Sequence, residues 1–450
     1  MKKIWAFLPP HIERIRSHRN AILARARGWG SLPLEIMANV FIMAAYDGKG
    51  IKTSLAISSV CQGWRRLGLS TSVLWAKFIF DDETKVTAMS LLMLLERSKS
   101  HPLNLSFNTS TTQILHIALP LLTEHARRWV CLDVELDIDD RPDFFDALVT
   151  MLPKPATLPL LKDLEIYDSY DDNPPLDYIP RIHLPALQNL HYSGAYRNVD
   201  FGFIGTQLED ISTTPTTLVG MESCVNLRKI HCNMHPDLVI AENLRLHFPN
   251  LGLLEVYFDQ AEWVLASRLF HSMASCSPEQ LDISIRTQDR DYYPKYKFNP
   301  PKSMLSRVDM ITVHFTGDGI FSPNNRINVH RLIEGCSVLG GVSIYDMPKA
   351  RLLLQGMAKS FPPSLEYIHI RNGGTLATEL KAILSHRRKQ GNELLEHLSL
   401  NQCGRRTNKM LARLKELVET VQWDSEGESE DEDEESDDDS SEDPNGFIRV

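Results

Sequence analysis

The stretch Leu395-Glu-His-Leu398-Ser-Leu400-Asn-Gln-Cys403 carries the pattern that decides the fold of this chain. An apolar residue is followed by two spacers, a second apolar residue, one spacer and a third apolar residue. Because side chains alternate between the two faces of a strand, the last two apolar residues share one face. The pattern therefore predicts a short strand that is buried on one side and exposed on the other.

The same pattern recurs along most of the chain. Its copies are Trp129-Leu132-Val134, Leu161-Leu164-Ile166, Leu187-Leu190-Tyr192, Leu227-Ile230-Cys232, Leu251-Leu254-Val256, Val308-Ile311-Val313, Leu339-Val342-Ile344 and Leu365-Ile368-Ile370. Leu281-Ile283-Ile285 is a variant with strict alternation, and Leu208-Ile211 is a weaker copy. The mean period is about 27 residues, which falls within the range of roughly 20–29 typical of leucine-rich repeats.

The array resembles an irregular leucine-rich-repeat solenoid. In this α/β arrangement parallel strands stack on the inside, helices return the chain on the outside, and the leucines fill the core between the two layers. Residues 144–152 and 352–357 have helical apolar spacing, and prolines such as Pro159 and Pro249 can end a returning helix before a strand. The asparagine or cysteine that should follow each strand is clear only near Cys403, so the turns are expected to vary. A single doubly wound parallel sheet is the alternative, but the sequence lacks the glycine-rich turn for a ligand.

A different pattern precedes the repeats. It consists of Leu32-Pro33-Leu-Glu-Ile36, then Val60-Cys61-Gln-Gly-Trp64, then Leu74-Trp75. Pro33 fits the first turn of a helix, where its missing N–H costs nothing, and Ser31 can cap that helix. Ile36, Val40, Phe41 and Ala44 recur at helical spacing, which predicts one apolar stripe along this helix. Two further short helical elements are expected after a rather long loop around residues 46–53.

In this order and spacing the pattern resembles an F-box, and the resemblance covers residues 31–76. It implies that this segment docks onto a Skp-family adaptor and, through it, onto a cullin. The residues that match the contact positions of the family are Leu32, Pro33, Ile36, Val60, Cys61 and Trp64. Three short helices bury little surface on their own, so several large apolar side chains are expected to serve a partner. The alternative is that Ile36, Val60 and Trp64 are core residues of an ordinary helical segment.

Together the two resemblances predict the substrate-recognition subunit of a Skp–cullin–F-box ubiquitin ligase. The repeat region, residues 77–423, would hold a target protein whose identity the sequence does not reveal. Catalysis would belong to other subunits, so the chain is expected to be no enzyme and to need no cofactor. One alternative is an F-box scaffold that binds protein partners without directing ubiquitination. Another is a repeat-based interaction protein of the nucleus, governed by its charged ends.

The target is expected on the concave side of the solenoid, because the residues between the apolar ones point there. These residues are Asp133, Glu135, Glu165, Tyr167, His191, His231, Glu255, Tyr257, Asp282, Arg286, His314, Tyr345, His369 and Arg371. Tyrosine and arginine are enriched among interface anchors. The preferred contacts are therefore Glu165, Tyr167, Glu255, Tyr257, Arg286 and Arg371. Because the early strands offer mostly acids, a target with a basic segment near the first repeats and an acidic one near the last is predicted.

The two ends of the chain carry opposite charge. The formal net charge is −10, yet residues 424–443 contain fourteen acids and no base, so the remainder is slightly basic. Residues 424–450 cannot bury apolar surface and are predicted to be disordered. Four serines there, Ser425, Ser429, Ser436 and Ser440, lie three residues before an acid and resemble casein-kinase-type sites. Residues 1–30 are basic. A solvated helix there is favoured over a membrane-surface helix, an organelle presequence or a segment that contacts the tail.

The sequence contains no catalytic motif of the P-loop, GxGxxG, GxSxG or HExxH type. His231, Cys232 and His235 are potential zinc ligands, but Cys232 falls on the buried side of a predicted strand, so ordinary repeat residues are favoured and no metal is expected. Seven scattered cysteines without a CxxC pair fit reduced thiols in an intracellular protein of the cytoplasm, the nucleus or both. No apolar run is long enough for a membrane span, and no nucleic acid is expected as a partner.

Overall fold

Parallel strands that stack in the order of the sequence form the body of the protein. The computed structural model describes residues 16–20, 22, 32–47, 49–81, 87–109, 112–136, 141–167, 182–193, 207–218, 221, 223–234, 240, 244–259, 263–286, 300–316, 333, 335–345, 362, 364–372, 377–389, 391, 394–403 and 408–424. The predicted disordered tail beyond Asp424 lies outside these residues. Of the predicted N-terminal helix, only residues 16–20 and 22 are described, and they are helical and exposed.

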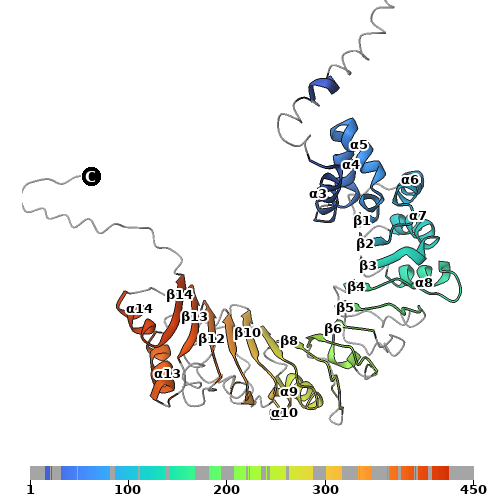
Figure 1. The fold of residues 1–450 in the computed structure, drawn as a ribbon. Helices are drawn as coiled ribbons and strands as arrows, with labels where there is room; N and C mark the ends of the chain where they lie inside the picture. The colour runs from blue at the N-terminus through green and yellow to red at the C-terminus, as the bar shows by residue number, and fades with distance from the viewer. Residues whose placement is uncertain are drawn as a thin grey trace, which may run out of the picture.

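Fourteen strands of the described chain pair into one sheet, and every neighbouring pair is parallel. They are β1 Lys77–Asp81, β2 Leu103–Thr109, β3 Trp129–Leu136, β4 Asp163–Tyr167, β5 Asn189–Ser193, β6 Asp210–Thr213, β7 Lys229–Asn233, β8 Leu253–Asp259, β9 Gln280–Arg286, β10 Met310–Thr316, β11 Gly341–Tyr345, β12 Tyr367–Arg371, β13 Leu395–Asn401 and β14 Val418–Asp424. The sheet curves into an arc (Figure 1). This is an α/β protein whose long parallel sheet is consistent with a repeat solenoid.

The strand pattern of the sequence is confirmed, because each of its eleven copies falls on one of the strands β3 to β13. Its last two apolar residues are buried in every case; Leu164 and Ile166 in β4 are examples. The pairing keeps these residues in register, so that Leu164 lies beside Leu190 of the next strand. Columns of apolar side chains therefore run from strand to strand and form the continuous core that a solenoid requires.

The order of the strands contradicts the alternative of a doubly wound sheet. In a doubly wound sheet the strand order reverses at a switch point and helices cover both faces. Here the order runs from β1 to β14 without a reversal. The helices that follow the strands lie on the outer side of the arc, and the strands line its inner side (Figure 1).

The outer layer is less regular than a strict alternation of strand and helix would give. Its helices are α6 Ala88–Ser98, α7 Thr112–Thr123, α8 Arg141–Met151, α9 Trp263–Ser272, α10 Lys302–Leu305, α13 Ala377–Lys389 and α14 Asn408–Lys415. The helix expected at residues 144–152 is α8, whereas residues 352–357 lie outside the described chain. Between β6 and β7 the described connection contains only the short 3₁₀ helix η5, Pro215–Leu218.

Three short helices and a 3₁₀ turn precede the first strand. They are α3 Leu34–Asp47, α4 Ile51–Val60, α5 Gln62–Ser70 and η2 Ser72–Trp75. The core of this unit is built from Met37, Phe41 and Ala45, which recur every four residues on one face of α3. The ring of Trp64 packs against that of Phe41 with a centroid distance of 4.7 Å.

Two expectations for this unit were wrong. Helix α3 has two apolar faces rather than one stripe: Phe41 is buried, whereas Ile36 and Val40 are exposed. The connection to α4 is also short, because α3 runs to Asp47 and α4 begins at Ile51. Gly50 makes the tight turn possible, since its φ is 54° and a Cβ atom there would lie 2.8 Å from the carbonyl oxygen of Lys77.

Trp75 joins the three-helix unit to the sheet. Its side chain is fully buried, and its Nε1 donates a hydrogen bond of 2.8 Å to the carbonyl oxygen of Gly68 in α5. The guanidinium of Arg97 in α6 lies over its ring at 4.7 Å from the centroid. The ion pair between Lys52 in α4 and Asp81 in β1, 3.0 Å long, ties the same two parts together. The helices are therefore continuous with the solenoid in packing as well as in sequence.

Candidate protein-interaction surfaces

The inner side of the sheet presents an unbroken row of polar side chains, here called the concave row. Its members pair in register from β3 to β13 and are Asp133, Glu165, His191, Ser212, His231, Glu255, Asp282, Thr312, Ser343, His369 and Ser399. The residues on either side of each member in its strand point into the core. The row is the predicted target face, and the chemistry of its side chains changes along its length.

The first part of this face is acidic. Asp133, Glu135, Asp163 and Glu165 lie side by side on β3 and β4 and are here called the acidic end. Burial and the neighbouring carboxylates Glu165 and Glu135 raise the pKa of Asp133, although a hydrogen bond from Ser106 opposes them.

Hydrogen bonds, two from β2 to β3 and one within β4, hold three of these carboxylates in place. The Ser106 hydroxyl donates to Asp133 over 2.8 Å, the Asn108 amide donates to Glu135 over 2.6 Å, and the Tyr167 hydroxyl donates to Glu165 over 3.0 Å. Burial and this bond to Glu165 raise the pKa of Tyr167 to about 12, so its phenol remains a donor at neutral pH. These four carboxylates have no ion pair among the described residues, and negative charge that is already oriented favours a basic partner segment.

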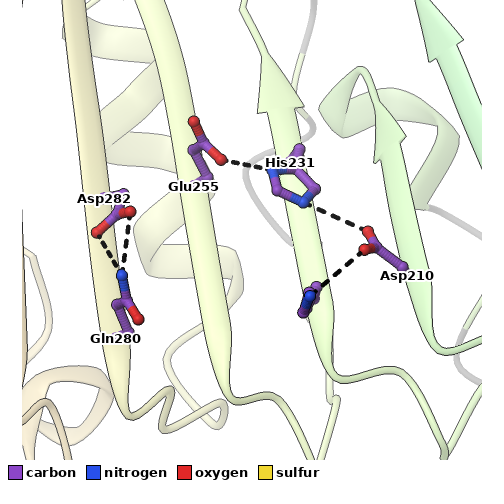
Figure 2. Close-up of polar contacts among 6 residues, drawn as sticks. Asp210, His231, Glu255, Gln280 and Asp282 are labelled. Atoms are coloured by element: carbon purple, nitrogen blue, oxygen red, sulfur yellow. Dashed lines mark hydrogen bonds and ion pairs between the residues drawn. The ribbon is translucent and has the colours of Figure 1, made fainter. Parts of the chain in front are cut away.

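A histidine held between two carboxylates lies at the middle of the face (Figure 2). The Nδ1 of His231 lies 2.5 Å from Glu255 in the following strand, and its Nε2 lies 3.3 Å from Asp210 in the preceding strand. Asp210 and Glu255 raise the pKa of His231 to about 9 against the opposing effect of burial. Burial alone would raise the pKa of Asp210, but His231, His191 and Lys229 lower it. At neutral pH the cluster is therefore a charged ion triplet across three strands.

We expect replacement of His231 by glutamine to destabilise the protein at pH 6 but not above about pH 9. The folded pKa is raised, so the stabilisation is complete below the unfolded value near 6.5 and disappears as the pH rises through about 9. Its size should be about 1–2 kcal/mol, less than the full shift would give, because Glu255 is 40% exposed and water screens the pair.

Urea midpoints of the wild type and His231→Gln between pH 6 and pH 10 measure this difference. His191→Gln is the matched control, since His191 occupies the same row and acts on Asp210 through its charge alone, with no carboxylate hydrogen bond among the described residues. A difference between His231→Gln and wild type that stays constant up to pH 10 would contradict the assignment.

The last part of the face is lined by rings rather than acids. His314, Tyr345, Tyr367, His369 and His397 lie on β10 to β13 and are here called the ring cluster. His314 and Tyr345 stack with a centroid distance of 4.3 Å, and Tyr367 and His397 stack at 5.3 Å. Arg371, exposed at the end of β12, adds a cation that has no ion pair among the described residues.

The predicted target contacts are distributed along this face. Glu165 and Tyr167 belong to the acidic end, Glu255 holds His231, and Arg371 lies beside the ring cluster. Tyr257 is half-buried in β8, in register with Ser284 of β9. Arg286 is the last residue of β9, and its side chain lies outside the described part. Tyr367 and His397 were not among the predicted contacts, because both occupy the two-residue spacer after the first apolar residue, whereas the predicted contacts follow the second and third.

The three-helix unit exposes a second surface, which is apolar. Ile36, Val40 and Met43 follow one another along the face of α3 opposite its core, and Ile36 is 47% exposed. Val60 at the end of α4 is 58% exposed, and Leu32 and Pro33 before α3 are exposed as well. Contiguous exposed apolar residues of this size mark interaction sites.

Two of the predicted docking residues serve the unit itself as well. The Sγ of Cys61 accepts a hydrogen bond of 3.4 Å from the backbone N–H of Trp64 and caps the start of α5. Trp64 is partly buried against Phe41. Substitution at these two positions therefore changes folding together with any binding, whereas Ile36 and Val60 report on binding alone.

The potential zinc ligands around His231 do not form a metal-binding cluster within the described residues. Cys232 is fully buried in the core, away from His231, and burial raises the pKa of its thiol to about 12. His235, the third potential zinc ligand, lies outside the described residues. No cluster of three or more potential ligands occurs in the described part of the chain, and all seven cysteines are free thiols.

No family model matches the chain, and no curated protein matches it in sequence. Among the described helices, none has the length and apolar character needed to cross a membrane.

Proposed function

We propose that this chain is the substrate receptor of a Skp–cullin–F-box ubiquitin ligase. In this proposal the three-helix unit binds the adaptor, the concave row and its neighbours bind the target protein, and other subunits perform the transfer of ubiquitin. The chain contributes recognition and placement rather than catalysis, so its surfaces and not its titratable groups carry the function.

The observation that carries the proposal is the exposed apolar face of α3 and the end of α4. A unit that had only its own core to form would bury Ile36, Val40 and Val60, yet Met37, Phe41 and Ala45 already fill that core. The exposed residues include four of the six that match the contact positions of an F-box: Leu32, Pro33, Ile36 and Val60. A large apolar face presented on helices suits helix packing with a protein partner.

The concave face supports the other half of the proposal. It combines an acidic end near the three-helix unit with a ring cluster and Arg371 farther along, so a target with an extended basic segment that enters at β3 and β4 fits its charge. Tyrosine, histidine and arginine side chains can contribute both contact area and hydrogen bonds at the distal part.

A scaffold that binds the adaptor without directing ubiquitination would use the same surfaces. The fate of the target distinguishes the two functions. A receptor releases its target to degradation, so target bound to the chain should accumulate when the proteasome is inhibited. A scaffold should retain the same amount of partner with or without inhibition.

Affinity purification of the full chain with mass spectrometry tests this function. We expect a Skp-family adaptor and a cullin in the wild-type sample. The double variant Glu165→Lys, Arg371→Glu should capture about tenfold less target or lower still, because each reversed charge would repel the target group that the original side chain attracted. It should capture the same amount of adaptor. Glu255 is left intact because it holds His231.

A control variant, Glu124→Lys with Lys302→Glu, makes the same pair of charge reversals at exposed positions away from the strands. It should retain both partners. Unchanged target capture by the Glu165 and Arg371 variant would show that the concave face does not bind the target. Absence of the adaptor from every sample would contradict the F-box assignment.

A further inference from the structure

The last two outer helices carry an unusual concentration of positive charge, here called the basic outer face. Helices α13 and α14 lie beside each other at the C-terminal end of the arc (Figure 1). Their exposed cations are Lys381, Arg388, Lys389, Lys409, Arg413 and Lys415. Apart from Glu379, whose side chain lies outside the described part, neither helix contains an acidic residue. Among the described residues these six cations form no ion pair; Arg388 alone has a contact, a hydrogen bond of 3.4 Å to the carbonyl oxygen of Glu416.

Compensation of the helix dipole explains only part of this face. Cations in a last helical turn are favourable because they lie near the partial negative charge of the C-terminus, which accounts for Arg388, Lys389, Arg413 and Lys415. Lys409 is in the first turn of α14, where the same dipole disfavours a cation. Lys381 is in the middle of the exposed side of α13 and gains nothing from either end.

The chain continues from this face into its most acidic segment. Strand β14 ends at Asp424, and residues 425–443 contain thirteen acids and no base. Helix α14 leads into β14 through the two residues Glu416 and Leu417 and packs on that strand. The acidic segment therefore begins at the end of β14, the strand against which α14 packs.

The spacing along the chain suits a return over these helices. Strand β14 has seven residues and spans roughly 23 Å. The densest run of acids begins at Glu430, six residues beyond Asp424, which corresponds to about 20 Å of extended chain. A segment that turned back at the end of β14 would thus run residues 425–430 along the length of that strand, on which α14 packs. The dense run of acids would then begin beside the end of α14 at Lys415.

We propose that the acidic segment 425–443 binds the basic outer face of α13 and α14 within the same chain. It would occupy the place of the next outer helix of the solenoid. Each contact is a weak, exposed ion pair, so the interaction depends on their number and on the tether. A tether of this length gives an effective concentration in the millimolar range.

Lysine labelling of the full-length protein tests the proposal. At low salt, Lys381, Lys389, Lys409 and Lys415 should react about fivefold to tenfold more slowly than in a full-length variant in which residues 430–435 are replaced by the matching amides (Glu430→Gln, Asp431→Asn and so on), as a tethered ligand at millimolar concentration predicts. Lys302, exposed on α10, is the internal control and should react equally in both proteins. The protection should disappear near 1 M salt, where charges are screened within about 3 Å.

Three outcomes would overturn the proposal. The first is equal labelling of the four lysines in both proteins. The second is protection that rises with protein concentration, which would make the contact one between chains. The third is protection that moves to Lys2 and Lys3, which would assign the acidic segment to the basic N-terminus. A face that is free in the intact chain but becomes protected by added duplex DNA or anionic vesicles would serve an external polyanion instead.

Discussion

The double variant Ile36→Asp, Val60→Lys should lose adaptor binding by roughly 100-fold or more while keeping wild-type stability. Each side chain is a large exposed apolar group of the kind that contributes about 2 kcal/mol or more when it is buried at the centre of an interface. The new charges would have to be desolvated on docking. They are chosen to suit the fold, because Ile36 lies in the first turn of α3 and Val60 in the last turn of α4. The helix dipoles favour an acid at the first of these positions and a base at the second.

Pull-down with a purified Skp-family adaptor, together with thermal unfolding of each variant, measures this effect. Leu160→Lys is the matched control, since Leu160 is 48% exposed in the connection before β4 and distant from the three-helix unit. The double variant Leu32→Ala, Pro33→Ala should weaken binding in the same direction. Normal adaptor binding by the Ile36 and Val60 variant would show that the apolar face has another purpose, and with it the F-box proposal would fail.

Replacement of Trp75 by alanine should reduce the free energy of unfolding by about 3–5 kcal/mol, the range for a fully buried tryptophan. The change removes the side chain that α5, α6 and the first strand share, together with its hydrogen bond to Gly68. Trp75→Phe keeps most of the ring and loses only that bond, so it should cost about 1–2 kcal/mol. Urea denaturation followed by circular dichroism measures both.

Tyr167→Ala serves as the control for the loss of an aromatic side chain at a half-exposed site on the sheet, and it should cost about 1 kcal/mol or less. If Trp75→Ala cost no more than this control, the three-helix unit and the solenoid would have to be regarded as separate units joined only by the chain.

The strands of the repeat region could be predicted because one pattern encodes both their position and their buried face. Leu164 and Ile166 are buried for the same reason as Leu398 and Leu400, and the parallel pairing follows from repetition. Strands β1, β2 and β14 were not predicted. The pattern is present in β1 as Trp75-Phe78-Phe80 and in β14 as Val418-Val421-Trp423, so both strands could have been found. Only β2, with Pro102 at the leading position, carries just a general strand signal.

The surfaces were harder to predict than the strands, for a physical reason. The sequence identifies which residues leave the core, but not which of them meet. That His231 lies between Asp210 and Glu255 depends on the register of three strands, and the distance between Asp210 and Glu255 in the sequence gives no hint of it. The same holds for α3, where the apolar spacing predicted one stripe. Only the packing of Phe41 against Trp64 decides which of two apolar faces is buried.

Because Trp75 joins the three-helix unit firmly to the sheet, each strand lies at a fixed distance from that unit. Parallel strands repeat at about 4.8 Å, so the eight steps from β4 to β12 cover roughly 40 Å along the sheet. A partner held at Glu165 and one held at Arg371 would thus stand at different, fixed distances from whatever is bound to α3 and α4. The position at which a partner binds along the concave row then decides which of its segments lie near a protein bound to α3 and α4. Selectivity can arise from position as well as from affinity.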